Sequence, residues 1–499
     1  MNGFYILLII LGYFGLLMLV AKLTSRQTDN DAFFRGNRKS PWYVVSFGMI
    51  GASLSGVTFV SVPGMVRGSD MTYMQTVIGF FVGYLLIAHV LLPIYYKLNL
   101  TTIYSYLNER IGRYSYKTGA SFFLLSKIIG AAARLYLVCL ILQHYVFEAL
   151  HVPFSISVIC IVILIWFYTR KSGIKTIVWT DSLQTFCLLV ALGLILYQVC
   201  IQMNLDAGSI IKAIADSDHS RIFVFDDWTS KQNFFKQFFS GIFITIVMTG
   251  LDQDMMQKNL SCKNLREAQK NMYSYGLSFV PVNFLFLSLG VLLLLLASQS
   301  GITLPEKSDD ILPFFAAEGR LGFATLVFFT IGIVAAAFSS ADSALTALTT
   351  SFCIDILGVE RTGDKKAEKK RKWSHFFISA IFIGFILLFK AANNDSIIDA
   401  IYTIASYTYG PLLGLFVFGL FTKMYPRDKY VPFVAIASPF MCFAIDQAVH
   451  QATGYQFGYE MLMFNGLLTF VGLTLLSINN KTRNTERNYG NKNRRIYHQ

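Results

Sequence analysis

Long runs of apolar residues restrict the fold of this chain more than any other feature of its sequence. "FYILLIILGYFGLLMLV" begins at Phe4, and "FLFLSLGVLLLLLA" begins at Phe284. An α-helix of about 20 apolar residues crosses the roughly 30 Å of hydrocarbon in a bilayer. Of the 499 residues, 54% are apolar and only 14% are charged, whereas soluble domains average about 25% charged residues. The sequence therefore predicts an all-α polytopic membrane protein.

We expect about thirteen transmembrane helices, which form a single transmembrane domain over residues 1–478. The first run has no basic segment before it and no small-residue cleavage site, which indicates a retained helix rather than a signal peptide. The predicted spans are residues 3–21, 42–64, 74–96, 118–147, 153–169, 175–201, 233–252, 273–298, 321–353, 374–390, 396–422, 430–447 and 461–478.

Lysine and arginine residues divide unequally between the two sides of this predicted domain. If the N-terminus lies outside, the inner loops, among them residues 253–272, and the tail contain 32 of the 42 basic residues, and the outer side contains 8. Because basic residues accumulate in cytoplasmic loops, we expect the N-terminus outside and the C-terminus inside the cell (inner) membrane. The same rule explains the net charge of +13 without nucleic acid. Residues 479–499 are expected to form a polar, disordered cytoplasmic tail.

Four polar residues, Ser339, Ser340, Asp342 and Ser343, interrupt a span that is otherwise apolar. Their spacing places them on one face of a helix. Hydroxyl and carboxylate oxygens are ligands for a hard cation. Serines alone also occur where helices pack closely or where a hydroxyl bonds back to its own helix. Asp342 favours the cation site, because close packing does not require a charge.

Two further ionisable residues in predicted spans are candidate functional groups. Asp181 follows a basic inner loop by about two helical turns, and it is either a functional carboxylate or an interfacial helix cap. Arg134 lies deep within the span 118–147. Its guanidinium needs an anionic partner, which is either the carboxylate of a substrate or an internal aspartate such as Asp342.

The stretch "SFGMIGASLSGVTFVSVPG", which begins at Ser46, is rich in glycine and hydroxyl residues. Glycine and β-branched residues are poor helix formers, so we expect a helix break near residues 51–57. A broken helix exposes backbone carbonyls to a cation and backbone amides to an anion. Close packing of a glycine-rich helix is the alternative, but it does not account for Ser53, Ser55 and Thr58 together.

Sequence motifs for enzymatic chemistry are absent. The chain contains no Walker A motif, no HExxH pair and no GxSxG elbow, and its predicted loops are too short for a soluble catalytic domain. We therefore expect a transporter and not an enzyme. A passive channel is the alternative from another class, and saturable uptake that requires Na⁺ would exclude it.

Five stretches follow one another along the chain: "FFRGNRKSPWYVVSFGMIGASLSGVTF", "TIVWTDSLQ", "GLDQDMMQKNLSCKN", "AAAFSSADSALTALTTSF" and "YTYGPLLGLFVFGLF". Together and in this order they resemble the sodium:solute symporter family, which includes sodium–glucose, sodium–proline and sodium–sialic acid cotransporters. The resemblance implies a leucine-transporter-like (LeuT) five-plus-five inverted repeat in which each repeat begins with a broken helix. It assigns residues 42–201 to the first repeat and residues 233–422 to the second.

The resemblance also implies two cation sites. Family members with a second Na⁺ have a serine where this chain has Asp342. The extra carboxylate could strengthen the second site, pair with Arg134 or carry a proton. The residues implied for the first Na⁺ are Gly51, Leu54, Ala336, Ser339 and Ser340, and those implied for the second cation are Asp181, Asp342 and Ser343.

Substrate contacts follow from the same resemblance. The "LSxxT" pattern at Leu54 together with Arg134 is similar to the sialic acid branch, in which the arginine meets the substrate carboxylate. The sugar branch would have glutamine where this chain has Thr58. We therefore expect Na⁺-coupled import of a small organic anion such as sialic acid. The implied substrate residues are Ser53, Ser55, Thr58, Gln75 and Arg134, with Gln75 aligned across a small gap.

Two alternatives remain within the transporter class. A sodium-coupled symporter of a sugar or another neutral solute would need no carboxylate-binding arginine. A proton-coupled symporter would use Asp342 and Asp181 as titrating groups. The sequence leaves the substrate, the ion stoichiometry and the oligomeric state open.

Overall fold

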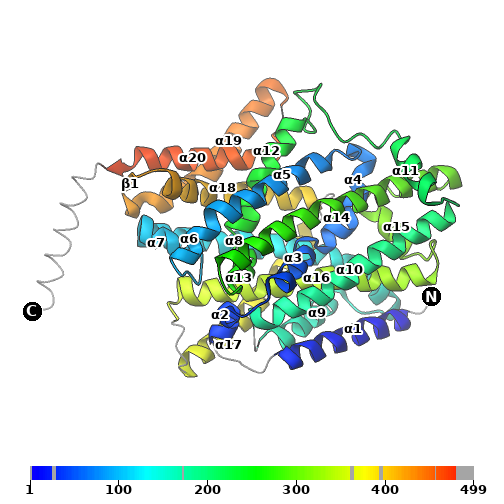
Figure 1. The fold of residues 1–499 in the computed structure, drawn as a ribbon, viewed down its shortest axis with the longest axis horizontal. Helices are drawn as coiled ribbons and strands as arrows, with labels where there is room; N and C mark the ends of the chain where they lie inside the picture. Colours follow the sequence, from blue (N-terminus) through cyan, green and yellow to red (C-terminus); the bar gives the residue numbers. More distant parts are fainter. Residues whose placement is uncertain are drawn as a thin grey trace, which may run out of the picture.

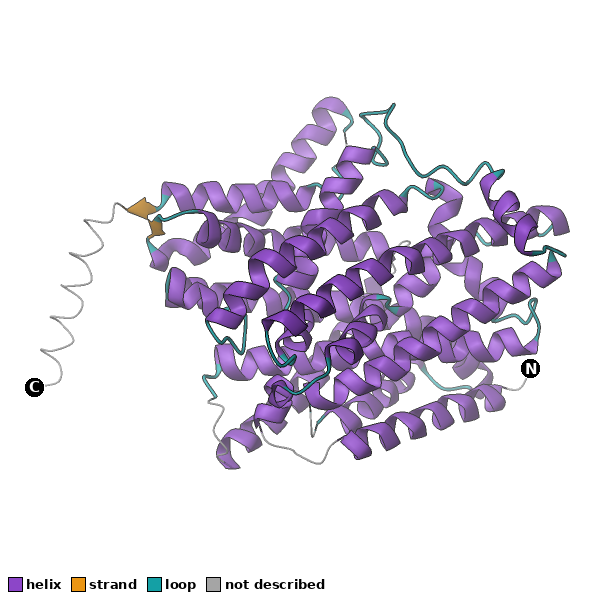
Figure 2. Ribbon diagram, in the orientation of Figure 1, coloured by secondary structure: helices purple, strands orange, loops and turns teal. Residues whose placement is uncertain are grey.

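The computed structural model describes residues 3–24, 30–170, 173–359, 365–392, 397–455 and 457–478. The predicted tail, residues 479–499, lies outside these described residues. Helices make up nearly all of the described chain (Figure 2), together with the short antiparallel pair β1 (Tyr425–Pro426) and β2 (Ser477–Ile478). The long helices lie side by side in one bundle, with α1 along one edge and α19 and α20 at the other (Figure 1).

The predicted spans agree with the structure. Among the described residues, nine helices are long and apolar enough to cross a membrane, two bent helix pairs pass the same test, and two shorter helices are apolar. Each of them overlaps one of the thirteen predicted segments. The long elements are α1 (Gly3–Thr24), α3 (Trp42–Ser53), α4 (Gly56–Ser69), α5 (Tyr73–Leu86), α8 (Arg113–Leu142), α9 (Phe154–Thr169), α10 (Ile174–Gln202), α12 (Phe234–Thr245), α14 (Leu265–Ser300), α16 (Phe323–Ser351), α17 (Lys365–Ala392), α18 (Ile397–Phe421), α19 (Val431–Thr453) and α20 (Met461–Leu475).

Short helices connect or extend these spans. Four π-helical turns continue longer helices without a break, which keeps the backbone hydrogen-bonded inside the apolar region. The short elements are α2 (Asn30–Arg35), η1 (Gly36–Arg38), η2 (Ile87–Leu91), α6 (Leu92–Lys97), α7 (Ser105–Arg110), η3 (Gln143–Phe147), η4 (Glu148–Leu150), α11 (Ala207–Ala215), η5 (Ile246–Gly250), α13 (Gln253–Leu260), η6 (Ser308–Asp310), α15 (Ile311–Ala316), η7 (Phe352–Ile356) and η8 (Asp428–Tyr430).

Two spans are broken, and each broken span is the first helix of one of the predicted repeats. The helices α3 and α4 meet at an angle of 58°, and the segment that ends with η5 meets α13 at 64°. Ser55 caps α4 by accepting a hydrogen bond from the Thr58 amide at 3.5 Å. Asp252 caps α13 by accepting one from the Asp254 amide at 2.8 Å. The predicted break near residues 51–57 is confirmed.

The prediction that residues 253–272 form a cytoplasmic loop is wrong for residues 253–260. Residues 253–260 form α13, and all eight of them are buried. Their polar side chains bond inside the protein: the Gln257 Nε2 donates to the Phe34 carbonyl at 2.9 Å, and the Lys258 Nζ lies 2.8 Å from an Asp181 oxygen. Because these polar groups bond to partners inside the protein instead of to water, the polar helix α13 can be buried in the core.

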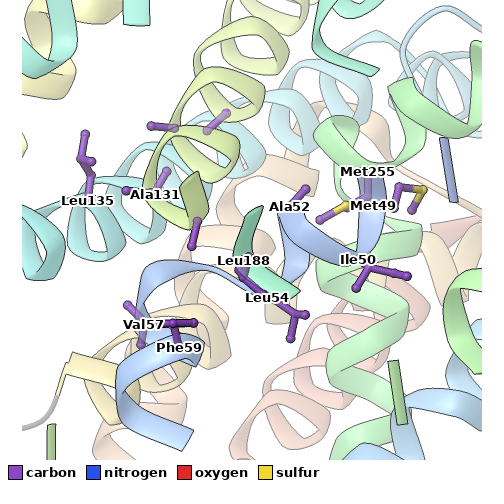
Figure 3. Close-up of a cluster of buried hydrophobic side chains, with 14 of the residues drawn as sticks. Met49, Ile50, Ala52, Leu54, Val57, Phe59, Ala131, Leu135, Leu188 and Met255 are labelled. Atoms are coloured by element: carbon purple, nitrogen blue, oxygen red, sulfur yellow. The ribbon is translucent and has the colours of Figure 1, made fainter. Parts of the chain in front are cut away.

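Apolar side chains enclose the first break from several directions. Figure 3 shows side chains of α3 and α4 beside side chains of α8, α10 and α13. The helices α3 and α10 can approach this closely because Gly51 has no side chain. A Cβ atom at that position would lie only 2.1 Å from the Thr185 Oγ1. The labelled side chains are Met49, Ile50, Ala52, Leu54, Val57 and Phe59 of the broken span, with Ala131, Leu135, Leu188 and Met255 around it.

The outer surface of the bundle carries large apolar side chains that water would not favour. Phe421 and Phe440 are each 72% exposed, and Leu475 is 81% exposed. Such side chains are suited to contact with lipid tails. The arrangement is that of a multi-pass membrane protein.

Candidate ion and solute sites

The first break and α16 meet at Ser340, one of the residues predicted for the first Na⁺. The Ser340 Oγ donates a hydrogen bond to the Ala52 carbonyl at 3.5 Å, directly between Gly51 and the break. Leu54, Ala336 and Ser339 are buried, and Ser340 is only 8% exposed. The Ser340 hydroxyl therefore faces the interrupted helix and not the lipid.

Backbone oxygens are available at this break because a helix leaves its last carbonyls without intrahelical partners. The α3 helix ends at Ser53, and its following residue, Leu54, donates its amide to the Ile50 carbonyl. The Gly51 amide donates to the Thr185 Oγ1 at 3.0 Å, which fixes α3 against α10. Carbonyl and hydroxyl oxygens thus converge in a buried space, and this donor set suits a hard cation.

The residues predicted for a second cation are only partly brought together. Asp181 accepts hydrogen bonds from the Ser339 Oγ at 2.8 Å and the Ser343 Oγ at 3.3 Å. Asp342 instead accepts one from the Tyr168 hydroxyl of α9 at 2.8 Å. The second oxygen of Asp342 has no hydrogen-bond partner among the described residues, and no ion pair there joins Asp342 to Arg134.

A lysine that the sequence reasoning missed binds the same aspartate. The Lys258 Nζ lies 2.8 Å from the Asp181 Oδ2, and the two side chains are 1% and 0% exposed. The sequence reasoning counted Lys258 with the basic residues of a cytoplasmic loop. Its position within "GLDQDMMQKNL", directly after the second break, is the signal that could have placed it in the core.

Alternating charges continue from Asp181 into the centre of the bundle, and we call this series the ion-pair chain: Asp181, Lys258, Asp254, Lys127 and Asp252. Lys258 lies 3.7 Å from Asp254, and Lys127 lies 2.8 Å from Asp254 and 3.1 Å from Asp252. Every side chain in it is at most 6% exposed. Buried charges of this kind are stable only when they are paired. The ion-pair chain links α8, α10 and α13.

A polar cavity lies at the other end of the ion-pair chain. Ser53 at the end of α3 lines it, and its hydroxyl is 2.5 Å from the Tyr275 hydroxyl, which is 2.8 Å from the Tyr84 hydroxyl. The Tyr409 hydroxyl donates to Asp252 at 2.8 Å. The polar lining residues are Ser53, Tyr84, Ser126, Lys127, Arg134, Thr245, Thr249, Asp252, Tyr275 and Tyr409.

Two of the five predicted substrate residues, Ser53 and Arg134, line this cavity. The structure does not bring the others into it. Ser55 caps α4 through the Thr58 amide. Gln75 is fully buried and donates to the Gln232 carbonyl at 2.9 Å while accepting from the Val224 amide at 3.1 Å. Gln75 therefore holds the segment between α11 and α12 against α5.

Comparisons with known proteins find a family of sodium-coupled transporters. A model of the sodium:solute symporter family matches residues 33–427. The sodium/sialic acid symporter NanT of Aliivibrio fischeri is 27% identical over 424 residues, covering 82% of this chain and 82% of that protein. The sodium/sialic acid symporter SiaT of Proteus mirabilis is 26% identical over 433 residues, covering 84% and 85%.

Solved structures share the fold. A Na⁺-coupled sialic acid symporter in a substrate-bound outward-open state superposes with a TM-score of 0.81 at 21% identity, covering 94% of this chain and 97% of that chain. Mhp1, a nucleobase-cation-symport-1 family transporter, superposes with a TM-score of 0.55 at 12% identity, covering 90% and 93%. The predicted leucine-transporter-like fold is thereby confirmed.

Proposed function

This chain belongs to the sodium:solute symporter family, and on that premise we propose that it imports an organic anion, sialic acid in particular, together with Na⁺ by alternating access. The observation that carries the proposal is that a candidate cation site and a polar cavity both lie at the first helix break. The Ser340 hydroxyl of α16 faces the Ala52 carbonyl at the first break, and a polar cavity that Arg134 lines begins at the same break. The two named relatives, both sodium/sialic acid symporters, support the choice of solute.

We assign the first Na⁺ to the break and to α16. The proposed ligands are oxygens of Gly51, Leu54, Ala336, Ser339 and Ser340. The contact of Ser340 with the Ala52 carbonyl supports this assignment, because a cation seated there would replace one hydrogen bond with several oxygen contacts. Na⁺ would join the broken span to α16 and stabilise one arrangement of the two helices.

Arg134 is the proposed contact for the carboxylate of the solute. Lys127, the other cation that lines the cavity, is already paired with Asp252 and Asp254. Among the described residues no carboxylate lies within ion-pair distance of Arg134, so its guanidinium is available for a bound anion. The hydroxyls of Ser53, Tyr84 and Tyr275 suit a solute that carries several hydroxyl groups of its own.

Coupling follows from the shared position of Ser53 and the first break. Na⁺ at the break would hold the end of α3, and Ser53 at that end lines the solute cavity. Each ligand then binds better when the other is present, as linkage requires. The inward Na⁺ gradient drives accumulation of the solute. From the distribution of basic residues, we further propose that the N-terminus lies outside and the C-terminus lies in the cytoplasm.

Uptake into proteoliposomes tests this function. Labelled N-acetylneuraminate should accumulate when external Na⁺ is present and should not accumulate when choline replaces Na⁺ at fixed pH. Uptake in choline under an imposed pH gradient would instead support proton-coupled symport. Competition by glucose or galactose, with no effect of N-acetylneuraminate, would support a neutral-sugar symporter.

A further inference from the structure

We propose that the Lys258 ammonium is the second cation of this transporter: it binds Asp181 where a second Na⁺ would be held, so that a single Na⁺ accompanies each solute molecule. This inference rests on the proposed function, because it concerns the stoichiometry of the same Na⁺ coupling. It begins from the ion pair between Lys258 and Asp181, in which the two closest atoms are 2.8 Å apart.

Both oxygens of Asp181 are already occupied. The Oδ1 accepts from the Ser339 hydroxyl, and the Oδ2 faces both the Ser343 hydroxyl and the Lys258 ammonium. A Na⁺ held by Asp181 and Ser343 would lie beside the ammonium among buried side chains. Two like charges at that separation repel strongly in a low-dielectric interior. The ammonium and a second Na⁺ therefore exclude each other at this carboxylate.

Lys258 is fixed in this place by the element that carries it. The α13 helix is buried along its whole length, and the Lys258 side chain is 1% exposed. Asp254, one turn earlier on α13, lies 3.7 Å from the ammonium and is itself held by Lys127. Lys258 is thus enclosed between two carboxylates, and leaving Asp181 would strand an unpaired charge in the core.

Asp342 does not restore the second site at Asp181. It occupies the position where two-sodium relatives are expected to have a serine, and its Oδ2 is taken by the Tyr168 hydroxyl. A Na⁺ bound through the remaining Asp342 oxygen is the competing arrangement. The Ser340 side of the first Na⁺ site is separate from this carboxylate, because the Ser340 hydroxyl faces the α3 break and not Asp181.

Counting bound ions tests the proposal. Radioactive Na⁺ bound at saturation to the purified full chain should number one per chain in the wild type, one in Lys258→Arg and two in Lys258→Met. The Ser340→Ala substitution should weaken binding of the single wild-type ion about tenfold, and in Lys258→Met it should weaken only one of the two ions. In proteoliposomes, the wild-type flux ratio of Na⁺ to N-acetylneuraminate should be one.

The wild-type count decides the matter even if Lys258→Met fails to fold. A count or flux ratio of two in the wild type would overturn the role of Lys258, and loss of one of these ions in Asp342→Ser would assign the second site to Asp342. A count of zero in the wild type, with no Na⁺-dependent uptake, would instead refute the proposed Na⁺ coupling. Two bound ions in Lys258→Arg would also contradict the proposal, because that variant keeps the positive charge.

Discussion

Ser339 and Ser340 are neighbours on α16, but their hydroxyls face different partners. Ser339 donates to the Asp181 carboxylate at 2.8 Å, whereas Ser340 donates to the Ala52 carbonyl at 3.5 Å. Ser339 already serves a charged group that has other donors. Ser340 is the hydroxyl that most directly connects α16 with the broken span, so its removal should affect Na⁺ more selectively.

We expect Ser340→Ala to raise the Na⁺ concentration for half-maximal uptake by about tenfold, since an oxygen that contacts a charged group contributes roughly 1.5–3 kcal/mol. Solute affinity at saturating Na⁺ should change far less. The Na⁺ dependence of N-acetylneuraminate uptake measures both quantities. Ser379→Ala is the matched control, because Ser379 is also buried but donates to its own helix at the His375 carbonyl. An unchanged Na⁺ dependence in Ser340→Ala would contradict the assignment.

Arg134→Ala should lower uptake of a carboxylate solute by about tenfold to a hundredfold, because it removes a charge-assisted contact. Binding of radioactive Na⁺ should persist, since Arg134 lies in the solute cavity and not at the first break. Arg320→Ala is the control: this arginine is exposed and pairs with Glu318. Retained uptake in Arg134→Ala would remove the argument for a carboxylate solute.

Among the elements, the broken span depends on its close approach to α10. The Gly51 amide donates to Thr185 of α10, and the Ser182 hydroxyl of α10 donates to the Val44 carbonyl at 3.0 Å. A residue larger than glycine at position 51 does not fit, because its Cβ atom would overlap the Thr185 hydroxyl. The α10 helix thus fixes where the first break lies.

Gly51→Ala should therefore destabilise the protein by about 1–3 kcal/mol through overpacking, and it should also weaken Na⁺ binding by moving the break. Thermal unfolding in detergent, with and without Na⁺, measures both effects. Gly193→Ala on α10 provides the control, because a Cβ atom at that position would have no neighbour within 4 Å. Equal unfolding temperatures for the two variants would show that the approach of α3 to α10 is not needed.

The elements also show what the sequence could and could not predict. Apolar length and charge bias were enough to predict the thirteen segments, and the glycine and hydroxyl residues near Ser53 were enough to predict the first break. They were not enough for α13, because a buried helix whose charges are paired internally has the composition of a polar loop. The partners of Lys258 are distant in sequence, and only the packing of α10 against α13 brings them together.

On the scale of the whole molecule, polar contacts tie the two halves of the sequence to each other. Lys127 and Asp181 lie before residue 202, whereas Asp252, Asp254, Lys258 and Ser339 lie after residue 233. A motion that separated the chain at that boundary would break all of these contacts. The unit that moves during transport must therefore combine helices from both halves.

The orientation in the membrane is also a property of the whole chain. Because 32 of 42 basic residues lie on the proposed inner side, we expect a fluorescent protein fused after residue 499 to fluoresce. Alkaline phosphatase at the same position should be inactive, since it folds only outside the cytoplasm. A fusion of each reporter within residues 216–230, in the acidic segment before α12, provides the control and should give the reverse result. Active phosphatase at the C-terminus would contradict the orientation.

The ammonium of Lys258 has a consequence for the electrical behaviour of the protein. If a resident amine replaces a mobile ion, one Na⁺ and one monovalent anion cross together and carry no net charge. Uptake would then produce no current, and a voltage across the membrane would neither help nor oppose it. A carrier that moved one more positive charge would gain about 2.3 kcal/mol per 100 mV, roughly a fiftyfold difference in accumulation. The concentration ratio of Na⁺ alone would set the limit for this protein.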